Sequence, residues 1–148
     1  NSVSMFGEDG WFRTGDFGSL NERGELLYIA RSKDIIRVGG ENFAPVEMED
    51  WIRNEFPGLQ FAIVGVSDPR LDEVPALVVL EGTAQQDLTR VLDAIRARFA
   101  NFKIPQHVFA VGEIPITSTS KIKRNELVAE IAGGRARKID VDVVARVR

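Results

Sequence analysis

Two short segments of this 148-residue chain carry the residue types that could perform chemistry. The segment Trp11–Asp16 places one carboxylate, that of Asp16, beside a glycine turn, and residues 118–124 place Lys121 directly after a run of hydroxyl side chains. An ionised carboxylate only accepts hydrogen bonds, which suits the paired hydroxyls of a ribose, and a lysine ammonium suits a phosphate. The two segments together predict a site for a nucleotide monophosphate.

Both segments also have a simpler interpretation. Asp16 could cap a turn through its own backbone, as aspartates in turns commonly do. Lys121, Lys123 and Arg124 stand where the last predicted helix begins, and the helix dipole disfavours a cation there by about 0.3–1 kcal/mol. An anion is therefore expected nearby, unless the segment is a solvated basic turn.

Further candidates lie between these two segments. Arg31 and Lys33 interrupt an apolar stretch that could have continued as one strand, so the chain requires charge or flexibility there. Gly39 and Gly40 leave a bare backbone that a narrow ligand could approach closely. A surface loop is the alternative in both places. His107 is followed by apolar residues and is interpreted as a strand residue, not as a catalytic base.

The composition argues against several classes of function. A net charge of −3 argues against an extended nucleic-acid interface, so we expect no nucleic-acid partner. The absence of cysteine and the single histidine lead us to expect no disulfide and no metal site in this chain. No run approaches the ~18 apolar residues of a membrane helix, and no signal-peptide pattern begins the chain, so we expect no transmembrane segment and a cytoplasmic protein. Residues 1–9 have no clear periodicity, which we interpret as part of a longer protein.

Apolar periodicity predicts the elements that must position these residues. Residues 21–24 predict the turn of a hairpin, and the nearly continuous apolar run at residues 59–66 predicts a strand buried on both faces. Further strands are predicted at residues 75–80 and 107–111, and helices from Pro45 to Phe56, across residues 83–99 with Thr83 and Gln86 as a capping box, and ending at Gly133. Residues 134–148 alternate weakly and could be a tail, an edge strand or the start of a further region. Together these elements predict an α+β fold in which helices pack on a small sheet.

In this order, the segments resemble the carboxyl-terminal portion of the adenylate-forming superfamily of acyl-CoA synthetases, adenylation domains and luciferases. Four motifs between residues 11 and 131 carry the resemblance: Trp11–Asp16, Arg31–Asp34, Gly39–Glu49 and Pro115–Ile122. The resemblance implies roles for individual residues, with Asp16 and Arg31 binding the AMP ribose, Lys33 acting as the pivot of a hinge, Lys121 acting as the adenylation lysine, and Gly39 and Gly40, with Arg37 nearby, lining the path of CoA.

The resemblance also implies a reaction in two halves. A carboxylic acid attacks the α-phosphate of Mg²⁺-bound ATP to give acyl-AMP and pyrophosphate, and the thiol of CoA then displaces AMP. Residues 1–32 would be the trailing part of a large N-terminal domain, residues 33–133 a C-terminal lid domain preceded by the hairpin, and residues 134–148 a tail. The N-terminal domain would be this lid's partner and would hold the phosphate loop, the acid pocket and most ligands of Mg²⁺. We therefore expect the isolated chain to be catalytically inert.

One residue departs from the family's pattern. Ser120 stands where the family usually has glycine before the lysine, and its Cβ restricts the torsions of that loop, so the efficiency of Lys121 is left open. Two other functions are compatible with the sequence: a module that binds AMP or CoA without chemistry, and a ligase that passes its acyl-AMP to a carrier protein. The acid pocket would lie upstream, so the sequence predicts no particular acid and no oligomeric state.

Overall fold

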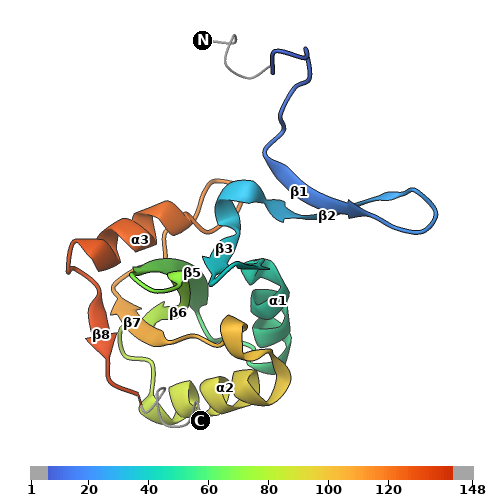
Figure 1. Cartoon of the computed structure of the whole chain (residues 1–148). Helices are drawn as coiled ribbons and strands as arrows, with labels where there is room; N and C mark the ends of the chain where they lie inside the picture. The colour runs from blue at the N-terminus through green and yellow to red at the C-terminus, as the bar shows by residue number, and fades with distance from the viewer. Residues whose placement is uncertain (1–6, 142–148) are drawn as a thin grey trace. The chain divides into compact units, whose positions relative to one another are not determined.

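The computed structural model describes residues 7–141, and its internal contacts divide the chain into two compact units between Ile35 and Ile36. Figure 1 labels the elements. The first unit contains β1 (Asp16–Leu20), β2 (Leu26–Arg31) and the 3₁₀ helix η1 (Ser32–Asp34). The second contains β3 (Ile36–Val38), β4 (Glu41–Phe43), α1 (Pro45–Glu55), β5 (Phe61–Asp68), β6 (Asp72–Leu80), α2 (Gln85–Arg98), η2 (Asn101–Lys103), β7 (His107–Val111), α3 (Arg124–Ala132) and β8 (Arg137–Ile139).

The first unit is an antiparallel hairpin, as the sequence predicts. Its register pairs Asp16 with Arg31 at one end and Leu20 with Leu26 at the other. The turn is closed by Asn21, whose side-chain oxygen accepts hydrogen bonds from the backbone N–H groups of Arg23 (3.0 Å) and Glu25 (2.9 Å). An asparagine that bonds the backbone in this way stabilises a turn locally, so the turn chemistry itself helps to set the register of the two strands.

The second unit is built around one mixed sheet. Its strands lie in the order β4-β3-β6-β7-β8, and β5 pairs with β6 outside this path. β6 and β7 are parallel and are connected through α2, whereas the other strand pairs are antiparallel. Three α-helices and this small sheet, counted over the described residues, confirm the predicted α+β class.

Helices cover the sheet on both faces. Phe61 and Ile63 of β5 belong to one apolar cluster with residues of α1 and α2, while Ala62 and Val64 belong to a second cluster with Leu127 of α3. Successive side chains of a strand point to opposite faces, so the prediction of a strand buried on both sides is confirmed. Figure 1 shows α3 on the other side of the sheet from α1 and α2.

All three predicted helices are present, but the predicted capping box is wrong. α2 begins after Ala84, which makes no side-chain cap. The hydroxyl of Thr83 instead donates to the carbonyl of Leu80 at 2.8 Å, because the turn leaving β6 brings that acceptor within reach. α1 begins at Pro45 as predicted, and α3 ends before Gly133.

Two short strands were not among the firm predictions. β4 was not predicted at all, and β8 realises one of the three interpretations left open for residues 134–148, because Arg137–Ile139 pairs as an edge strand with β7. Residues 142–148 lie outside the described residues. No helix within residues 7–141 is long and apolar enough to cross a membrane.

Candidate functional site

Asp16 and Arg31, the predicted ribose-binding pair, face each other across the hairpin. Arg31 Nε lies 2.9 Å from Asp16 Oδ1, and the two side chains are 54% and 37% exposed. Their strands place them opposite each other in the register, so the hairpin itself creates the pair. A carboxylate that accepts from hydroxyls next to a guanidinium that donates is a combination able to bind a vicinal diol.

The backbone before Asp16 fixes this pair from one side. Gly15 has φ +72°, a left-handed conformation that favours glycine, and its carbonyl accepts a hydrogen bond from Ser32 N at 2.7 Å. Thr14 Oγ1 accepts from Asp16 N at 3.1 Å, and the Thr14 carbonyl accepts from Arg31 Nη1 at 3.2 Å. Thr14 therefore caps the turn. The Asp16 carboxylate does not cap it and pairs with Arg31 instead.

Lys121 lies in a small loop that is closed by several hydrogen bonds. Ile116 and Ile122 form an antiparallel bridge at its base. Thr117 N donates to the Lys121 carbonyl at 2.7 Å, and Lys121 N donates to Thr117 Oγ1 at 3.1 Å. The backbone on which the lysine stands is thus held on both sides, while the Lys121 side chain is exposed and forms no ion pair or hydrogen bond with the residues that the structure describes.

Ser120 adopts the conformation that the usual glycine would supply. Its φ is +60°, in the left-handed region, and its N–H donates to the Thr117 carbonyl at 2.9 Å. For a residue with a Cβ this conformation costs roughly 1–2 kcal/mol. The loop geometry is therefore retained despite the substitution, at a cost in local strain.

The other two cations of this basic segment, Lys123 and Arg124, form ion pairs with carboxylates of the same chain. Lys123 Nζ lies 2.9 Å from Glu126 Oε1, and Arg124 Nη2 lies 2.5 Å from Glu49 Oε2. The expectation of a nearby anion is thus met for these two residues by carboxylates of the protein itself. Of the three cations, Lys121 alone keeps an ammonium without a partner among the described residues.

Glu49 of α1 is a buried residue that was not among the predicted site residues. Its side chain is only 2% exposed and its Oε1 accepts from the Ile63 N–H at 2.9 Å. A signal was present, since position 49 falls on the helix face that buries Met48 and Ile52. A carboxylate on such a face requires a partner.

Gly39 and Gly40 form the two-residue turn between β3 and β4. Their φ values of +57° and +92° match a type I′ hairpin turn, in which both central residues need positive φ. Gly39 N also donates to the Leu71 carbonyl at 2.8 Å, and a Cβ on Gly39 would approach the Leu71 side chain to 3.1 Å. The backbone conformation of this turn therefore explains why glycine occupies both positions. The predicted role of the two glycines toward CoA stays a prediction.

The remaining predicted residues occupy separate places. Arg37 is exposed on β3, and its backbone N–H donates to Glu73 Oε2 at 2.9 Å. Lys33 is exposed in η1, shortly before the division between the two units, and its role as a pivot is untested. His107 is a strand residue, as interpreted, and burial together with Lys138 lowers its pKa.

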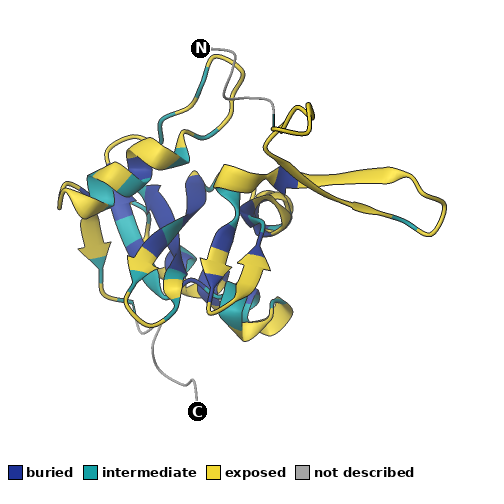
Figure 2. Cartoon of the chain, turned by 45° about the horizontal axis from the view of Figure 1, so that its top comes forward, coloured by how far each residue is buried: buried dark blue, intermediate teal, exposed yellow. Residues whose placement is uncertain are grey.

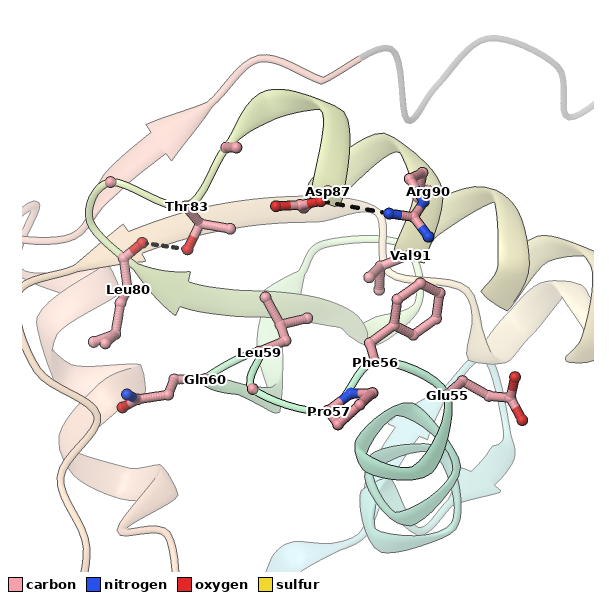
Figure 3. A pocket seen from close by; sticks show the side chains of 13 residues that line it. Glu55, Phe56, Pro57, Leu59, Gln60, Leu80, Thr83, Asp87, Arg90 and Val91 are labelled. Carbon is pink, nitrogen blue, oxygen red and sulfur yellow. Dashed lines mark hydrogen bonds and ion pairs between the residues drawn. The ribbon is translucent and has the colours of Figure 1, made fainter.

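A pocket of about 650 Å³ opens between the end of α1 and the start of α2 (Figure 3). None of the predicted site residues lines it. Its polar side chains largely serve local contacts, since Asp87 pairs with Arg90 at 3.8 Å and Thr83 bonds Leu80. Across residues 7–141 no group of three or more His, Cys, Asp or Glu side chains could hold a metal ion.

Comparison with known proteins identifies the family. Residues 47–121 match the AMP-binding enzyme C-terminal domain, and the chain belongs to this family, within the adenylate-forming superfamily. It is 38% identical over 120 residues to a 2-succinylbenzoate–CoA ligase of Listeria monocytogenes and 33% identical over 121 residues to a mitochondrial medium-chain acyl-CoA ligase of Pongo abelii. The alignments cover 80% and 81% of this chain.

A solved structure gives the same assignment. The o-succinylbenzoate CoA synthetase of Bacillus subtilis, in complex with its acyl-adenylate intermediate, superposes with a TM-score of 0.70 at 29% identity and covers 94% of this chain. The chain spans about a quarter of that protein, and 25% and 20% of the two ligases above. The fold is therefore that of the C-terminal domain of acid–thiol ligases.

Proposed function

We propose that this chain is the C-terminal part of an ATP-dependent acyl-CoA synthetase, in which Lys121 promotes formation of the acyl-adenylate. The observation that carries the proposal is the Lys121 loop. Its backbone is locked by Thr117 on both sides, while its ammonium has no partner among the described residues. The ligase names of the relatives support the same reaction class.

In the first half-reaction, Lys121 would bridge the attacking carboxylate and the α-phosphate of ATP. A carboxylate oxygen forms a bond to phosphorus, and pyrophosphate leaves. A cation about 4 Å from a unit negative charge gains roughly 4 kcal/mol at an effective dielectric near 20, before desolvation is counted. The lysine therefore acts by orientation and electrostatic stabilisation and transfers no proton.

Asp16 and Arg31 would bind the ribose of the adenylate. Both side chains are partly exposed in this pair, so the carboxylate can still accept from hydroxyl groups and the guanidinium can still donate to them. Mg²⁺ would neutralise charge on the phosphates of ATP. Since the described residues contain no metal-binding cluster, we assign its protein ligands mainly to the N-terminal domain.

In the second half-reaction, the Gly39–Gly40 turn would line the path of CoA, with Arg37 on the neighbouring strand. The thiol attacks the acyl carbon, AMP leaves, and a thioester is formed. In the proposed mechanism, the lid presents the Lys121 loop to the reaction centre in one orientation and the Gly39–Gly40 turn in another. A rotation of the lid about Lys33, between residues 1–32 and residues 33–133, would present them in turn.

The exposed apolar residues of the hairpin support a partner surface on an N-terminal domain. Figure 2 shows nearly the whole hairpin exposed. Leu20, Leu26 and Tyr28 are 64–76% exposed. Exposed apolar groups of this density are normally covered in the assembled protein. Because the acid pocket and phosphate loop would belong to that domain, the chain alone should release no pyrophosphate, and robust carboxylate-dependent release from it would refute this part of the proposal.

The decisive experiment compares two lysines of the same segment in the complete protein. Lys121→Ala should slow acid-dependent pyrophosphate release by roughly 10²–10³-fold, as expected for loss of a preorganised electrostatic group. Lys123→Ala is the matched control, because its ammonium pairs with Glu126, and it should change the rate by less than about twofold. Equal rates for Lys121→Ala and the unaltered protein would contradict the proposal and favour a module that only binds AMP or CoA.

The acceptor of the acyl group is tested separately. Purified acyl-AMP is supplied with CoA or with a phosphopantetheinylated carrier protein. We expect thioester formation with free CoA, in keeping with the CoA-ligase names of the relatives. Transfer to the carrier alone would instead identify a ligase that loads carrier proteins.

A further inference from the structure

Glu49 and Arg124 bind both backbone polar groups of one residue, Ile63, on the open edge of the sheet. Among the described strands β5 pairs only with β6, so its other edge presents unpaired backbone groups. The Ile63 N–H donates to Glu49 Oε1 at 2.9 Å, and the Ile63 carbonyl accepts from Arg124 Nε at 3.2 Å. The ion pair between Glu49 Oε2 and Arg124 Nη2 at 2.5 Å closes the ring. The pair thus replaces a missing strand neighbour.

The two side chains reach this edge from opposite faces of the sheet. Glu49 belongs to α1, which packs in the same cluster as α2, whereas Arg124 is the first residue of α3, whose Leu127 packs in the other cluster. The side chains of Glu49 and Arg124 are only 2% and 18% exposed. The ion pair therefore ties both helix layers to a single residue of β5.

Arg124 stands three residues after Lys121, at the junction between the lysine loop and α3. Leu127 is the one fully buried residue of α3, and partly buried apolar residues of the helix and of the loop before it pack against the same cluster. The loop is also connected to this junction by the hydrogen bond from Lys123 N to the Pro115 carbonyl at 2.9 Å. Arg124 therefore connects the end of the Lys121 loop to the edge of β5.

We propose that the Glu49–Arg124 pair positions Lys121 for adenylation by fixing the beginning of α3 to the edge of β5. Neither residue is assigned contact with substrate, and both act through the lysine. This inference rests on the proposed function of Lys121. It predicts that weakening the pair harms the half-reaction that uses Lys121 and spares the half-reaction that does not.

The test uses the complete protein and Arg124→Gln. The rate constant of acyl-AMP formation at saturating ATP should fall about tenfold or more, because displacement of a reacting group by about 1 Å can cost up to 10²-fold. Thioester formation from supplied acyl-AMP and CoA should stay within about twofold. Arg53→Gln is the matched control: Arg53 also approaches Glu49, at 3.5 Å, but it is 48% exposed and lies on α1, away from the loop in sequence. It should leave both half-reactions within about twofold.

A double-mutant cycle distinguishes positioning from general loss of structure. If Arg124 acts through Lys121, then Arg124→Gln should cause no further loss of adenylation in a Lys121→Ala background. The same tenfold loss in both backgrounds would overturn the inference. If Lys121→Ala itself has no effect, the proposed function fails, and this outcome is separate from the failure of the positioning inference.

Arg124→Lys is a second, more conservative variant that keeps the test possible if Arg124→Gln does not fold. Lysine keeps the positive charge, but it lacks the planar guanidinium with which arginine bonds both the Glu49 carboxylate and the Ile63 carbonyl. We expect a folded protein with an intermediate loss in adenylation and an unchanged CoA half-reaction. Full adenylation activity in folded Arg124→Lys and Arg124→Gln proteins would overturn the positioning role.

Discussion

Arg31 Nε and Asp16 Oδ1 lie 2.9 Å apart on opposite strands of one hairpin, so the two candidate ribose ligands are held as a preformed unit. Asp16→Asn keeps the shape of the side chain but removes the charge that orients Arg31 and accepts from hydroxyls. A hydrogen bond to a charged group contributes about 1.5–3 kcal/mol, so we expect AMP to bind roughly tenfold to 100-fold more weakly. Calorimetric titration of the complete protein with AMP measures this. Glu22→Gln, in the exposed turn of the same hairpin, is the control and should leave the affinity unchanged.

Ser120 provides a second prediction, because it holds φ at +60° in the loop of Lys121. Ser120→Gly removes strain of roughly 1–2 kcal/mol, although glycine gives back about 0.5–1 kcal/mol through its freedom in the unfolded chain. We therefore expect a gain of up to about 1.5 kcal/mol. Ser120→Val should lose at least 1 kcal/mol, since a β-branched residue is a strong outlier at positive φ.

Denaturant unfolding of the glycine and valine variants measures this order. Ser118→Val is the matched control for hydroxyl loss in the same loop, because Ser118 does not have positive φ. A valine at position 120 that is tolerated as well as one at position 118 would contradict the strain that we assign to Ser120.

Periodic apolar residues made most of the fold predictable from the sequence. The stripe of Leu88, Val91 and Ile95 identified α2, and the unbroken apolar run of β5 identified a strand covered on both faces. β4 was missed because only Phe43 of its three residues is buried, which is too little for an alternating pattern. The predicted capping box does not form because the Thr83 hydroxyl donates to the Leu80 carbonyl in the turn before α2.

The site was predictable only in part, for a related reason. Asp16 and Lys121 stood out because their types and settings suggest ligands, and the hairpin turn then determined that Asp16 meets Arg31. The role of Glu49 depends on Arg124, 75 residues further along the chain. Local patterns indicate that Glu49 falls on the buried face of α1, but they carry no information on which residue pairs with it.

The Gly39–Gly40 turn gives a third prediction. Gly39→Ala places a Cβ at φ +57° and 3.1 Å from the Leu71 side chain, so we expect a loss of stability of about 1–2 kcal/mol or more. If the turn lines the path of CoA, thioester formation from supplied acyl-AMP should fall more than acyl-AMP formation does. Stopped-flow measurement of each half-reaction, below the unfolding temperature, separates the two effects.

Gly112→Ala is the control for this variant. Its Cβ would meet no atom within 4 Å, and its φ is not positive. It should leave stability within about 0.5 kcal/mol, as surface substitutions usually do, and should leave both half-reactions unchanged. If Gly39→Ala slows the two half-reactions equally, the turn has a structural role alone.

Glu49 and Glu47 offer a direct comparison between a buried and an exposed ion pair on one helix. Glu49→Ala leaves the Arg124 guanidinium and the Ile63 N–H without their acceptor in a buried place, and removal of one partner of such a pair costs about 3–5 kcal/mol. Glu47→Ala breaks the pair with Lys103 at 2.7 Å, but the Glu47 side chain is 57% exposed, so the cost should be below about 1 kcal/mol. Urea unfolding of both variants measures the difference. Similar losses for the two would show that water reaches the Glu49–Arg124 pair, and the edge of β5 would then not depend on it. We expect the steeper loss for Glu49→Ala, because this pair joins α1, β5 and α3 through buried contacts.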